Sequence, residues 1–397
     1  MSKHVLLGVS GGISVYKSPG IVSRLKKLGI KVRVIMTEHA TEFITPLTFQ
    51  TMSNETVHVE MFNQLSNMDV EHISLAKWAD CMIIAPATAN TIAKLAYGIA
   101  DNMLTTVAMA TRAKILIAPA MNTHMLEAES TQEALKILAS RKNVEILPTA
   151  EGLLACQDVG SGKMLEPDDI VDYILEALTP KTMEGLELTV TAGPTKERLD
   201  PVRFISNHSS GKTGYAIATE ARNRGAKVHL ISGPTHLPKP RGVDFISVES
   251  TQEMYDAVEK VFPTSDILIK SAAPSDYKPV QYAHEKIKKS SGENLTVEFS
   301  PNPDIAKHFG NIKGDRVVVG FAAESHRVEE YAKKKLKSKN FDFIVANNIC
   351  EENAGFASET NHVKIFSSNG KEEELPMMEK SALAVEILDR LTERLKS

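Results

Sequence analysis

The chain has 397 residues, of which 24% are charged, and a formal net charge of −4 at pH 7. This length predicts two or three domains, and the small negative charge gives no electrostatic reason to expect nucleic acid or an anionic membrane surface as a partner. The first residues read as a strand and no apolar run reaches membrane-spanning length, so we expect no signal peptide and no membrane anchor; three scattered cysteines favour a reducing cytoplasm.

Strand and helix patterns alternate through the first half of the chain. His4–Val9 and Lys31–Met36 predict two strands with an amphipathic helix between them. Asp80–Ala85 and Lys114–Ala118 predict two more strands, separated by a helical stretch, Thr91–Met109. This alternation indicates an α/β fold with a mostly parallel sheet, and such sheets bind ligands at the carboxyl ends of their strands.

The carboxyl ends of these four strands carry polar or glycine-containing turns. The turns are Ser10–Ile13, Thr37, Pro86–Asn90 and Pro119–Asn122. The first turn lies before a helix, where free backbone N–H groups favour a phosphate or another polar ligand. Because Ser10 occupies the place of the second glycine in a GxGxxG motif, this turn alone does not identify the ligand.

The second half restarts the alternation after a polar joint. Helix Pro167–Leu178 closes the first half, and Thr179–Gly185 contains the Pro and Gly typical of a linker, so we place two Rossmann-like domains at 1–180 and 181–397. A terminal helix is expected over Glu379–Leu395, and Lys333–Lys339 alone would read as a solvated helix face. Strands are expected at Leu186–Thr191, Lys227–Ser232, Asp244–Val248, Ile267–Ser271, Arg316–Phe321 and Phe341–Ala346.

The stretch Thr191–Gly214 is the most informative part of the second half. It follows a strand and precedes an amphipathic helix, so its Gly/Ser-rich end predicts an anion site at a helix N-terminus. Gly211–Thr213 suggests a Walker A loop, but that motif requires a glycine where Ser206 stands. The pattern therefore predicts a phosphate site of another kind.

The words of this stretch, TAGPTxExxDPVRxISNxSSGKxG, resemble the opening of the phosphopantothenoylcysteine synthetase family. The alternative is a Rossmann-like turn that holds some other phosphate. The resemblance implies that cysteine is joined to 4'-phosphopantothenate through an acyl-cytidylate made from CTP with Mg2+, which leaves open a preference for CTP over ATP. Asn207 is then expected to support the attack of cysteine, and Ser209, Ser210 and Gly211 to receive a phosphate of either substrate.

Further motifs carry the same resemblance. Lys270–Tyr277 is similar to the AAxADY strand end of that family and Glu285–Lys289 to its EKIKK motif. Lys286 is expected to stabilise the charge that develops as the acyl-cytidylate forms, and Asp276 to engage the base or the metal. The nucleotide contacts implied are Lys270, Ser271, Ala272, Asp276, Lys286, Asn302, Pro303, Asp304, Ile305, Phe321, Lys335 and Lys339.

The first half resembles a family of flavoproteins that decarboxylate cysteine-containing substrates. The words that carry this resemblance are GVSGGISxYK, HISLAKWAD, Ala85–Asn90 and Ala118–Met125. Members with the ligase domain behind them decarboxylate phosphopantothenoylcysteine, using FMN as the electron sink that a plain thiol carbon lacks. The resemblance places FMN at Gly11, Gly12, Ile13, Thr37, Thr88, Ala89, Asn90 and Thr91.

Three residues of the first half are expected to take part in catalysis. The resemblance implies that His72 acts as base or orienting group, that Asn122 holds the substrate carboxylate and that Cys156 protonates the product. Without the motifs, His72 would be a structural histidine and Asn122 a turn cap. Cys156 lies in a Gly-flanked flap, Gly152–Gly162, which departs from the family at Leu153, Leu154 and Gln157; Cys81 reads as a core residue.

These features favour a bifunctional enzyme of coenzyme A biosynthesis, a decarboxylase (lyase) and ligase that uses FMN, Mg2+, 4'-phosphopantothenate, cysteine and CTP. One alternative is an active ligase with an inactive flavin domain as scaffold. Another is a flavin- or nucleotide-binding regulatory module without turnover. By analogy with the family we expect a homo-oligomer, a dodecamer.

Overall fold

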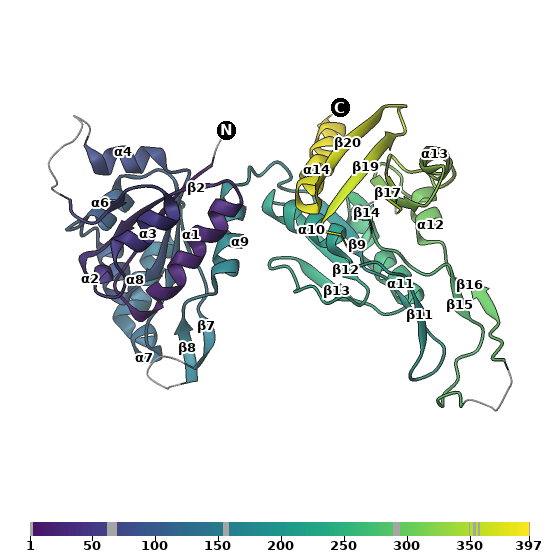
Figure 1. The fold of residues 1–397 in the computed structure, drawn as a ribbon, viewed down its shortest axis with the longest axis horizontal. Helices are drawn as coiled ribbons and strands as arrows, with labels where there is room; N and C mark the ends of the chain where they lie inside the picture. The colour runs from purple at the N-terminus through teal and green to yellow at the C-terminus, as the bar shows by residue number, and fades with distance from the viewer. Residues whose placement is uncertain are drawn as a thin grey trace. The chain divides into compact units, whose positions relative to one another are not determined.

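The computed structural model describes residues 3–61, 70–153, 159–288, 294–348, 350–351, 355 and 358–396. The chain divides into two compact units, Met1–Thr179 and Pro180–Ser397, each built on its own sheet (Figure 1). The division lies in the polar stretch in which the sequence places a linker. No helix in the described ranges is long and apolar enough to cross a membrane.

The sheet of the first unit has six parallel strands in the order β3-β2-β1-β4-β5-β6. The strands are β1 His4–Val9, β2 Lys31–Met36, β3 Val57–His58, β4 Cys81–Ala87, β5 Lys114–Pro119 and β6 Val144–Ile146. The order reverses between β1 and β4, which lie side by side in the middle of the sheet. Such a reversal leaves a crevice at the carboxyl ends of the two strands, where α/β proteins bind ligands.

Helices cover both faces of this sheet because alternate strand residues point to opposite sides. In β1, Val5 and Leu7 are buried with residues of α1 and α9, and Leu6 is buried with residues of α5, α6 and α8. The helices are η1 (a 3-10 helix) Ile13–Lys17, α1 Ser18–Lys27, α2 Glu38–Thr41, α3 Pro46–Ser53, α4 Glu71–Trp78, α5 Ala89–Tyr97, α6 Met103–Ala110, α7 Thr123–Glu127, α8 Glu129–Ala139 and α9 Pro167–Leu178.

The single helical stretch expected over Thr91–Met109 is wrong, because two helices occupy it. Helix α5 ends at Gly98, which takes the left-handed backbone conformation (φ 73°) that glycine adopts without strain. Helix α6 then begins after Asn102, whose side chain accepts a hydrogen bond from the backbone N–H of Thr105. The stop and start signals were both present in the sequence.

The second sheet has eight strands in the order β13-β12-β9-β14-β17-β18-β19-β20, of which the first six are parallel. The parallel strands are β9 Glu187–Ala192, β12 Lys227–Ser232, β13 Asp244–Ser247, β14 Ile267–Lys270, β17 Val317–Glu324 and β18 Phe343–Asn348. Taken in chain order they repeat the arrangement of the first sheet, with the reversal between β9 and β14. The predicted α/β architecture with mostly parallel sheets is confirmed in both units.

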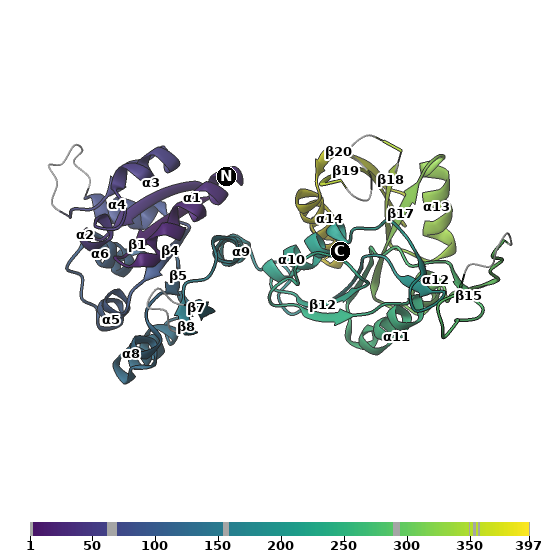
Figure 2. The ribbon, with the colours of Figure 1, turned by 60° about the horizontal axis from the view of Figure 1, so that its bottom comes forward.

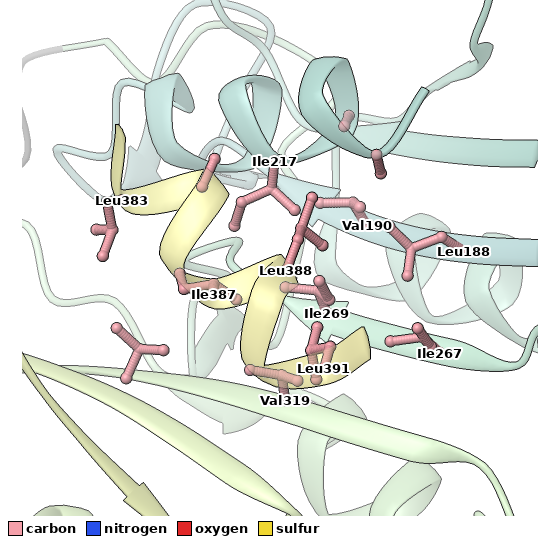
Figure 3. Close-up of a cluster of buried hydrophobic side chains, with 14 of the residues drawn as sticks. Leu188, Val190, Ile217, Ile267, Ile269, Val319, Leu383, Ile387, Leu388 and Leu391 are labelled. Atoms are coloured by element: carbon pink, nitrogen blue, oxygen red, sulfur yellow. The ribbon is translucent and has the colours of Figure 1, made fainter. Parts of the chain in front are cut away.

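Helices flank the second sheet (Figure 2), and a hydrophobic layer lies against each of its faces. One layer packs α10 and α14 against β9 and β14, and Figure 3 shows Leu388 and Leu391 beside Ile269 in this cluster. The other layer contains α11, α12 and α13. The helices are α10 Lys212–Asn223, α11 Thr251–Val261, η2 (a 3-10 helix) Phe262–Thr264, α12 Ile305–Asn311, α13 Val328–Ser338 and α14 Lys380–Lys396.

Four pairs of strands in the described part of the chain were not predicted from the sequence. Three are two-stranded ribbons, and the fourth extends the second sheet beyond β18. They are β7 Ala150–Leu153 with β8 Val159–Lys163, β10 Lys196–Arg198 with β11 Phe204–Ser206, β15 Tyr277–Pro279 with β16 Phe299–Pro301, and β19 Thr360–Ser367 with β20 Glu372–Glu379. Figure 1 shows β15 and β16 projecting from the body of the second unit.

Candidate functional site

The first unit contains a cavity of about 470 Å3 at the point where its strand order reverses. Residues that follow β1 and β4 line one part of it, and residues that follow β5 line another. The lining residues are Gly12, Ile13, Ser14, Tyr16, Lys17, Thr88, Ala89, Ala120, Met121, Asn122, Met125, Gly162 and Lys163. The structure thus brings together five residues that the sequence assigned to FMN or substrate: Gly12, Ile13, Thr88, Ala89 and Asn122.

A buried serine joins the two loops at the reversal. Ser10 is 1% exposed. Its hydroxyl donates to the carbonyl oxygen of Pro86 (2.8 Å) and accepts from the backbone N–H of Thr88 (3.0 Å). The Thr88 hydroxyl in turn accepts from the backbone N–H of Thr91 and caps α5. The serine that replaces a motif glycine is therefore what fixes the β1 and β4 loops together.

The glycine beside it allows a close approach of the β2 loop. A Cβ on Gly11 would lie 2.6 Å from the Cβ of His39, in α2, so a side chain at this position would collide with that helix. The hydroxyl of Thr37 accepts from the backbone N–H of Ala40 and caps α2. Gly11 and Thr37 thus shape the loops around the cavity without lining it, and the same holds for Asn90 and Thr91.

Asn122 lies at the cavity and also caps a helix. Its carboxamide oxygen accepts from the backbone N–H of His124 (2.8 Å) at the start of α7. The hairpin β7–β8 packs on this segment: the backbone N–H of Met121 donates to the carbonyl oxygen of Gly162 (3.0 Å), and a Cβ on Gly162 would meet the Met121 oxygen at 2.4 Å. Cys156, between the two hairpin strands, lies outside the described residues.

The sequence reasoning missed two charged residues that line this cavity, Lys17 and Lys163. The ammonium of Lys17 is 4% exposed and donates to the carbonyl oxygen of Met164 and to a carboxylate oxygen of Glu166, both at 2.7 Å. Its only sequence signal was its place at the end of the GVSGGISxYK match.

His72 does not join this group. It is half-buried in the first turn of α4, next to the pair formed by His58 and Glu71 (2.6 Å), and it is not among the residues that line the cavity. Cys81 lies in the core of β4, as expected, where burial raises the pKa of its thiol to about 12.

The second unit has its candidate site at the matching place. The loop after β9 and the loop after β14 meet through a bridge between Pro194 and Ala273, where the backbone N–H of Ala273 donates to the Gly193 oxygen (3.0 Å). The amide nitrogen of Asn207 donates to the carbonyl oxygens of Ala273 (3.0 Å) and Pro274 (3.2 Å). Asn207 thus ties the segment before α10 to the loop after β14.

A tightly packed glycine turn leads into α10. Gly211 caps this helix with φ 79°, and a Cβ there would lie 2.8 Å from the Thr235 Cγ2 and 3.4 Å from the Gly193 Cα. Ser209 and Ser210, just before it, are half-buried. Lys212, the first residue of α10, forms an ion pair with Glu359. The arrangement presents hydroxyls and a helix N-terminus to one side of the β9 loop.

Charged residues from four elements gather beyond β14. Lys339 pairs with Asp304 (3.2 Å), the N-cap of α12, and Lys335 pairs with Glu324 (2.6 Å) at the end of β17. Burial, followed by the charge of Lys339, lowers the pKa of Lys270 to about 8, while the charges of Asp304 and Asp276 oppose this shift. Lys270 is therefore a cation that titrates near neutral pH inside a mixed-charge group.

Asn302 and Asp276 belong to the same group. The backbone N–H of Asn302 donates to the carbonyl oxygen of Asp276 (2.8 Å), and its side-chain amide donates to the oxygen of Ser275 (2.9 Å). Within the described ranges, no cluster of three or more His, Cys, Asp or Glu side chains could hold a metal ion. An ion here would thus take most of its ligands from a bound phosphate or from water.

The other predicted nucleotide contacts have different surroundings. The side chain of Ile305, the first residue of α12, is buried in the hydrophobic cluster that also contains residues of α11 and α13, and Phe321 packs against the core on the other face of the sheet. Ala272 donates its backbone N–H to the Thr191 hydroxyl (3.3 Å), and Lys286 is exposed on the segment after β15. Ser271 and Pro303 lie on the loops that lead into the charged group.

Sequence reasoning also missed a buried network that supports these loops. Glu197, 4% exposed, accepts from the backbone N–H (2.9 Å) and hydroxyl (2.8 Å) of Thr251 at the start of α11. The Thr195 hydroxyl shares a hydrogen bond with the Thr251 hydroxyl (2.9 Å) and accepts from the backbone N–H of Ser275 (2.9 Å). A glutamate in a polar motif gives no signal that it is buried.

Comparisons with known proteins cover both units. The family model described as Flavoprotein matches residues 1–179, and the model described as DNA/pantothenate metabolism flavoprotein C-terminal domain matches residues 183–395. The chain is 45% identical to the Bacillus subtilis protein named coenzyme A biosynthesis bifunctional protein CoaBC over 98% of this chain and 97% of that protein. It is 44% identical to the Escherichia coli protein of the same name, over 99% and 97%.

Among solved structures, the C-terminal domain of a coenzyme A biosynthesis bifunctional protein CoaBC is 41% identical to the chain. That structure covers 54% of this chain and 98% of its own length, with a TM-score of 0.48.

Proposed function

The chain belongs to the family of coenzyme A biosynthesis bifunctional proteins, and we propose that its two units divide the two reactions of that family between them. The second unit joins cysteine to 4'-phosphopantothenate. The first unit decarboxylates the resulting phosphopantothenoylcysteine to 4'-phosphopantetheine. The chain is thus both a carbon–nitrogen ligase and a carbon–carbon lyase. The observation that supports this division is that each unit gathers its own set of polar residues where its strand order reverses.

The residues that line the first cavity offer hydrogen-bond donors suited to FMN. Backbone N–H groups of Gly12 and Ile13 at the start of η1 favour a phosphate, Gly11 lets the loop pass close to α2, and Thr88 lines the same space. When bound, the flavin supplies a reversible two-electron oxidation of the cysteine thiol, which makes loss of CO2 possible. We assign Asn122 to the substrate carboxylate and Cys156 to protonation of the product; His72 stays a proposal that rests on its motif.

In the second unit, the two polar atoms of the Asn207 side chain are assigned different roles. Its amide nitrogen holds two loop carbonyls, so its carboxamide oxygen is the group that can accept a hydrogen bond from the attacking amine of cysteine. Lys270, Lys335 and Lys339 offer positive charge to a triphosphate, and Lys286 offers charge to the acyl-cytidylate. Ser209, Ser210 and Gly211 offer a site to a second phosphate.

The proposal has four further parts: the ligase reaction uses Mg2+, its nucleotide is CTP, the protein is located in the cytoplasm, and it assembles to a dodecamer. Mg2+ would be held by the triphosphate together with Asp276, because the described residues supply few acidic ligands in one place. CTP follows from the family resemblance, and the compartment from the scattered cysteines.

The experiment that tests the proposal measures each half-reaction by itself. The purified full chain should show a flavin absorption band and release CO2 from phosphopantothenoylcysteine. It should also release pyrophosphate from CTP when 4'-phosphopantothenate is present. Cys156→Ser should leave decarboxylation intact but accumulate an oxidised product, detected by its mass. A colourless protein that releases pyrophosphate and no CO2 would favour the alternative of a ligase with an inactive flavin scaffold.

A further inference from the structure

The segment that carries Lys286 is held by the turn between β10 and β11. The backbone N–H of Ala283 donates to the carbonyl oxygen of Leu199 (3.0 Å). At Ile287 both backbone groups are engaged: its N–H donates to Asp200 Oδ2 (3.1 Å), and its oxygen accepts from Arg203 Nη2 (2.6 Å). Lys286 lies directly beside this double contact, and its own side chain is exposed.

Asp200 is the centre of this attachment. The residue is 1% exposed, and its Oδ1 accepts from the backbone N–H groups of Val202 (2.8 Å) and Arg203 (2.7 Å). The guanidinium of Arg203 lies 3.5 Å from Oδ2, the oxygen that receives Ile287. Although burial opposes ionisation, these N–H groups and Arg203 hold the pKa of Asp200 below its usual range. One oxygen of the Asp200 carboxylate therefore accepts the hydrogen bonds that form the turn, and the other accepts the hydrogen bond from the segment that carries Lys286.

We propose that Asp200 is a positioning residue of the ligase reaction, which sets the place of Lys286 through its hydrogen bond to the backbone of Ile287. This inference rests on the proposed role of Lys286. The hydrogen bond to Ile287 and the turn bonds come from different oxygens, so one substitution can separate them. Asn at this position keeps an oxygen for Val202 and Arg203 but turns an N–H2 group toward the N–H of Ile287, where two donors face each other.

The test compares Asp200→Asn, Lys286→Gln and the double variant in the full chain. Because displacement of a reacting group by about 1 Å costs roughly a hundredfold in rate, we expect Asp200→Asn to lower the kcat of ligation by about 10- to 100-fold with little change in KM. In the Lys286→Gln background the same change should have no further effect, since the two residues act through one interaction. Additive losses would overturn the proposal.

A control variant separates positioning from general loss of stability. Asp342 is also a buried carboxylate of the second unit that accepts from a backbone N–H, that of Val318 (2.8 Å), and from a cation, Lys313 (2.8 Å), but it lies at the amino end of β18, whereas the candidate site lies at the carboxyl ends of the strands. Asp342→Asn should destabilise the unit and leave ligation by the folded protein unchanged. An equal loss of kcat in Asp342→Asn and Asp200→Asn would contradict a positioning role.

A second measurement does not depend on activity. Trypsin cleaves after lysine, and Lys286 and Lys288 are exposed on the attached segment. Limited digestion of Asp200→Asn should cut there several times faster than in the original protein or in Asp342→Asn, because the segment has lost an attachment. If cleavage is faster but Lys286→Gln ligates normally, the proposed role of Lys286 fails and with it the positioning role. Unchanged cleavage with unchanged ligation would overturn the attachment itself.

Discussion

Ser10 shows how one buried hydroxyl can decide the shape of a binding cavity. Ser10→Ala leaves the Thr88 N–H without its buried acceptor and leaves the Pro86 oxygen only the backbone N–H of Ser10 (3.2 Å), so we expect the free energy of unfolding of the first unit to fall by about 1–3 kcal/mol. Flavin retention should fall with it, because the same bond joins the two loops of the cavity. Urea denaturation and the flavin content after gel filtration measure both effects.

A surface serine provides the comparison. The hydroxyl of Ser140 donates to the carbonyl oxygen of Ile137 at the exposed end of α8. Ser140→Ala should leave stability and flavin content unchanged. If the two variants behave alike, the Ser10 bond does not fix the cavity.

We expect nucleotide binding to depend on pH, because Lys270 is one of the proposed nucleotide contacts. Its pKa of about 8 means that the ammonium is charged below pH 8 and neutral well above it. The affinity for CTP with Mg2+ should therefore fall as pH rises above 8, by up to about tenfold per pH unit, since binding then requires uptake of one proton. Titration calorimetry from pH 7 to 9.5 measures this slope. Lys270→Met should flatten it, whereas Lys260→Met, a change at an exposed lysine of α11, should retain it.

For single residues, the sequence predicted which residues lie near a candidate site better than it predicted the role of each side chain. The motifs around Lys270, Asp276 and Asn302 predicted a set of residues that the fold does bring together. Ile305 and Phe321 lie in the same motifs, yet their side chains pack into cores, because a motif does not state which way each side chain points. In the sequence, Ser10 was interpreted only as the replacement of a motif glycine, and Lys17 only as a residue of the GVSGGISxYK match, so the buried contacts of both were missed.

Two glycines with similar backbone angles allow the effect of backbone strain to be measured apart from the effect of close packing. Gly211 lies at the start of α10, and Gly185 lies before β9. Gly211 (φ 79°) and Gly185 (φ 84°) both adopt left-handed conformations, but a Cβ on Gly211 would lie 2.8 Å from Thr235, and one on Gly185 would meet nothing within 4 Å. Gly185→Ala should cost about 1–2 kcal/mol of stability from backbone strain alone. Gly211→Ala should cost more than that and also weaken ligation, because it displaces the loop that carries Ser209 and Ser210. Thermal unfolding and a ligation assay measure the difference, and equal effects of the two substitutions would contradict the close packing of this turn.

Helices were predictable where the hydrophobic periodicity of their sequence is strong, and strands where both of their faces are buried. The core strands and α9 follow the sequence closely, since parallel strands covered on both faces read as apolar runs. The ribbons and β20 were missed because their residues are largely polar and exposed, as the acidic β20 shows. β19 was missed although its Val363, Ile365 and Phe366 are buried. In the β15–β16 ribbon the two strands, Tyr277–Pro279 and Phe299–Pro301, are also separated in the chain, so no local pattern links them.

The two units should work independently when each is given its own substrate. Lys286→Gln should strongly lower the rate of ligation, to a residual level, and leave CO2 release from added phosphopantothenoylcysteine unchanged, because Lys286 belongs to the second unit alone. Chromatographic assay of both products in one variant measures this. Loss of both activities would show that the reactions depend on each other.

The whole account is tested most directly by a single incubation analysed by mass spectrometry. The full chain is given 4'-phosphopantothenate, CTP, Mg2+ and cysteine labelled with 13C in its carboxyl group. The account predicts CMP, pyrophosphate, labelled CO2 and 4'-phosphopantetheine without label, in equal amounts. Absence of both phosphopantothenoylcysteine and 4'-phosphopantetheine from the products would contradict it.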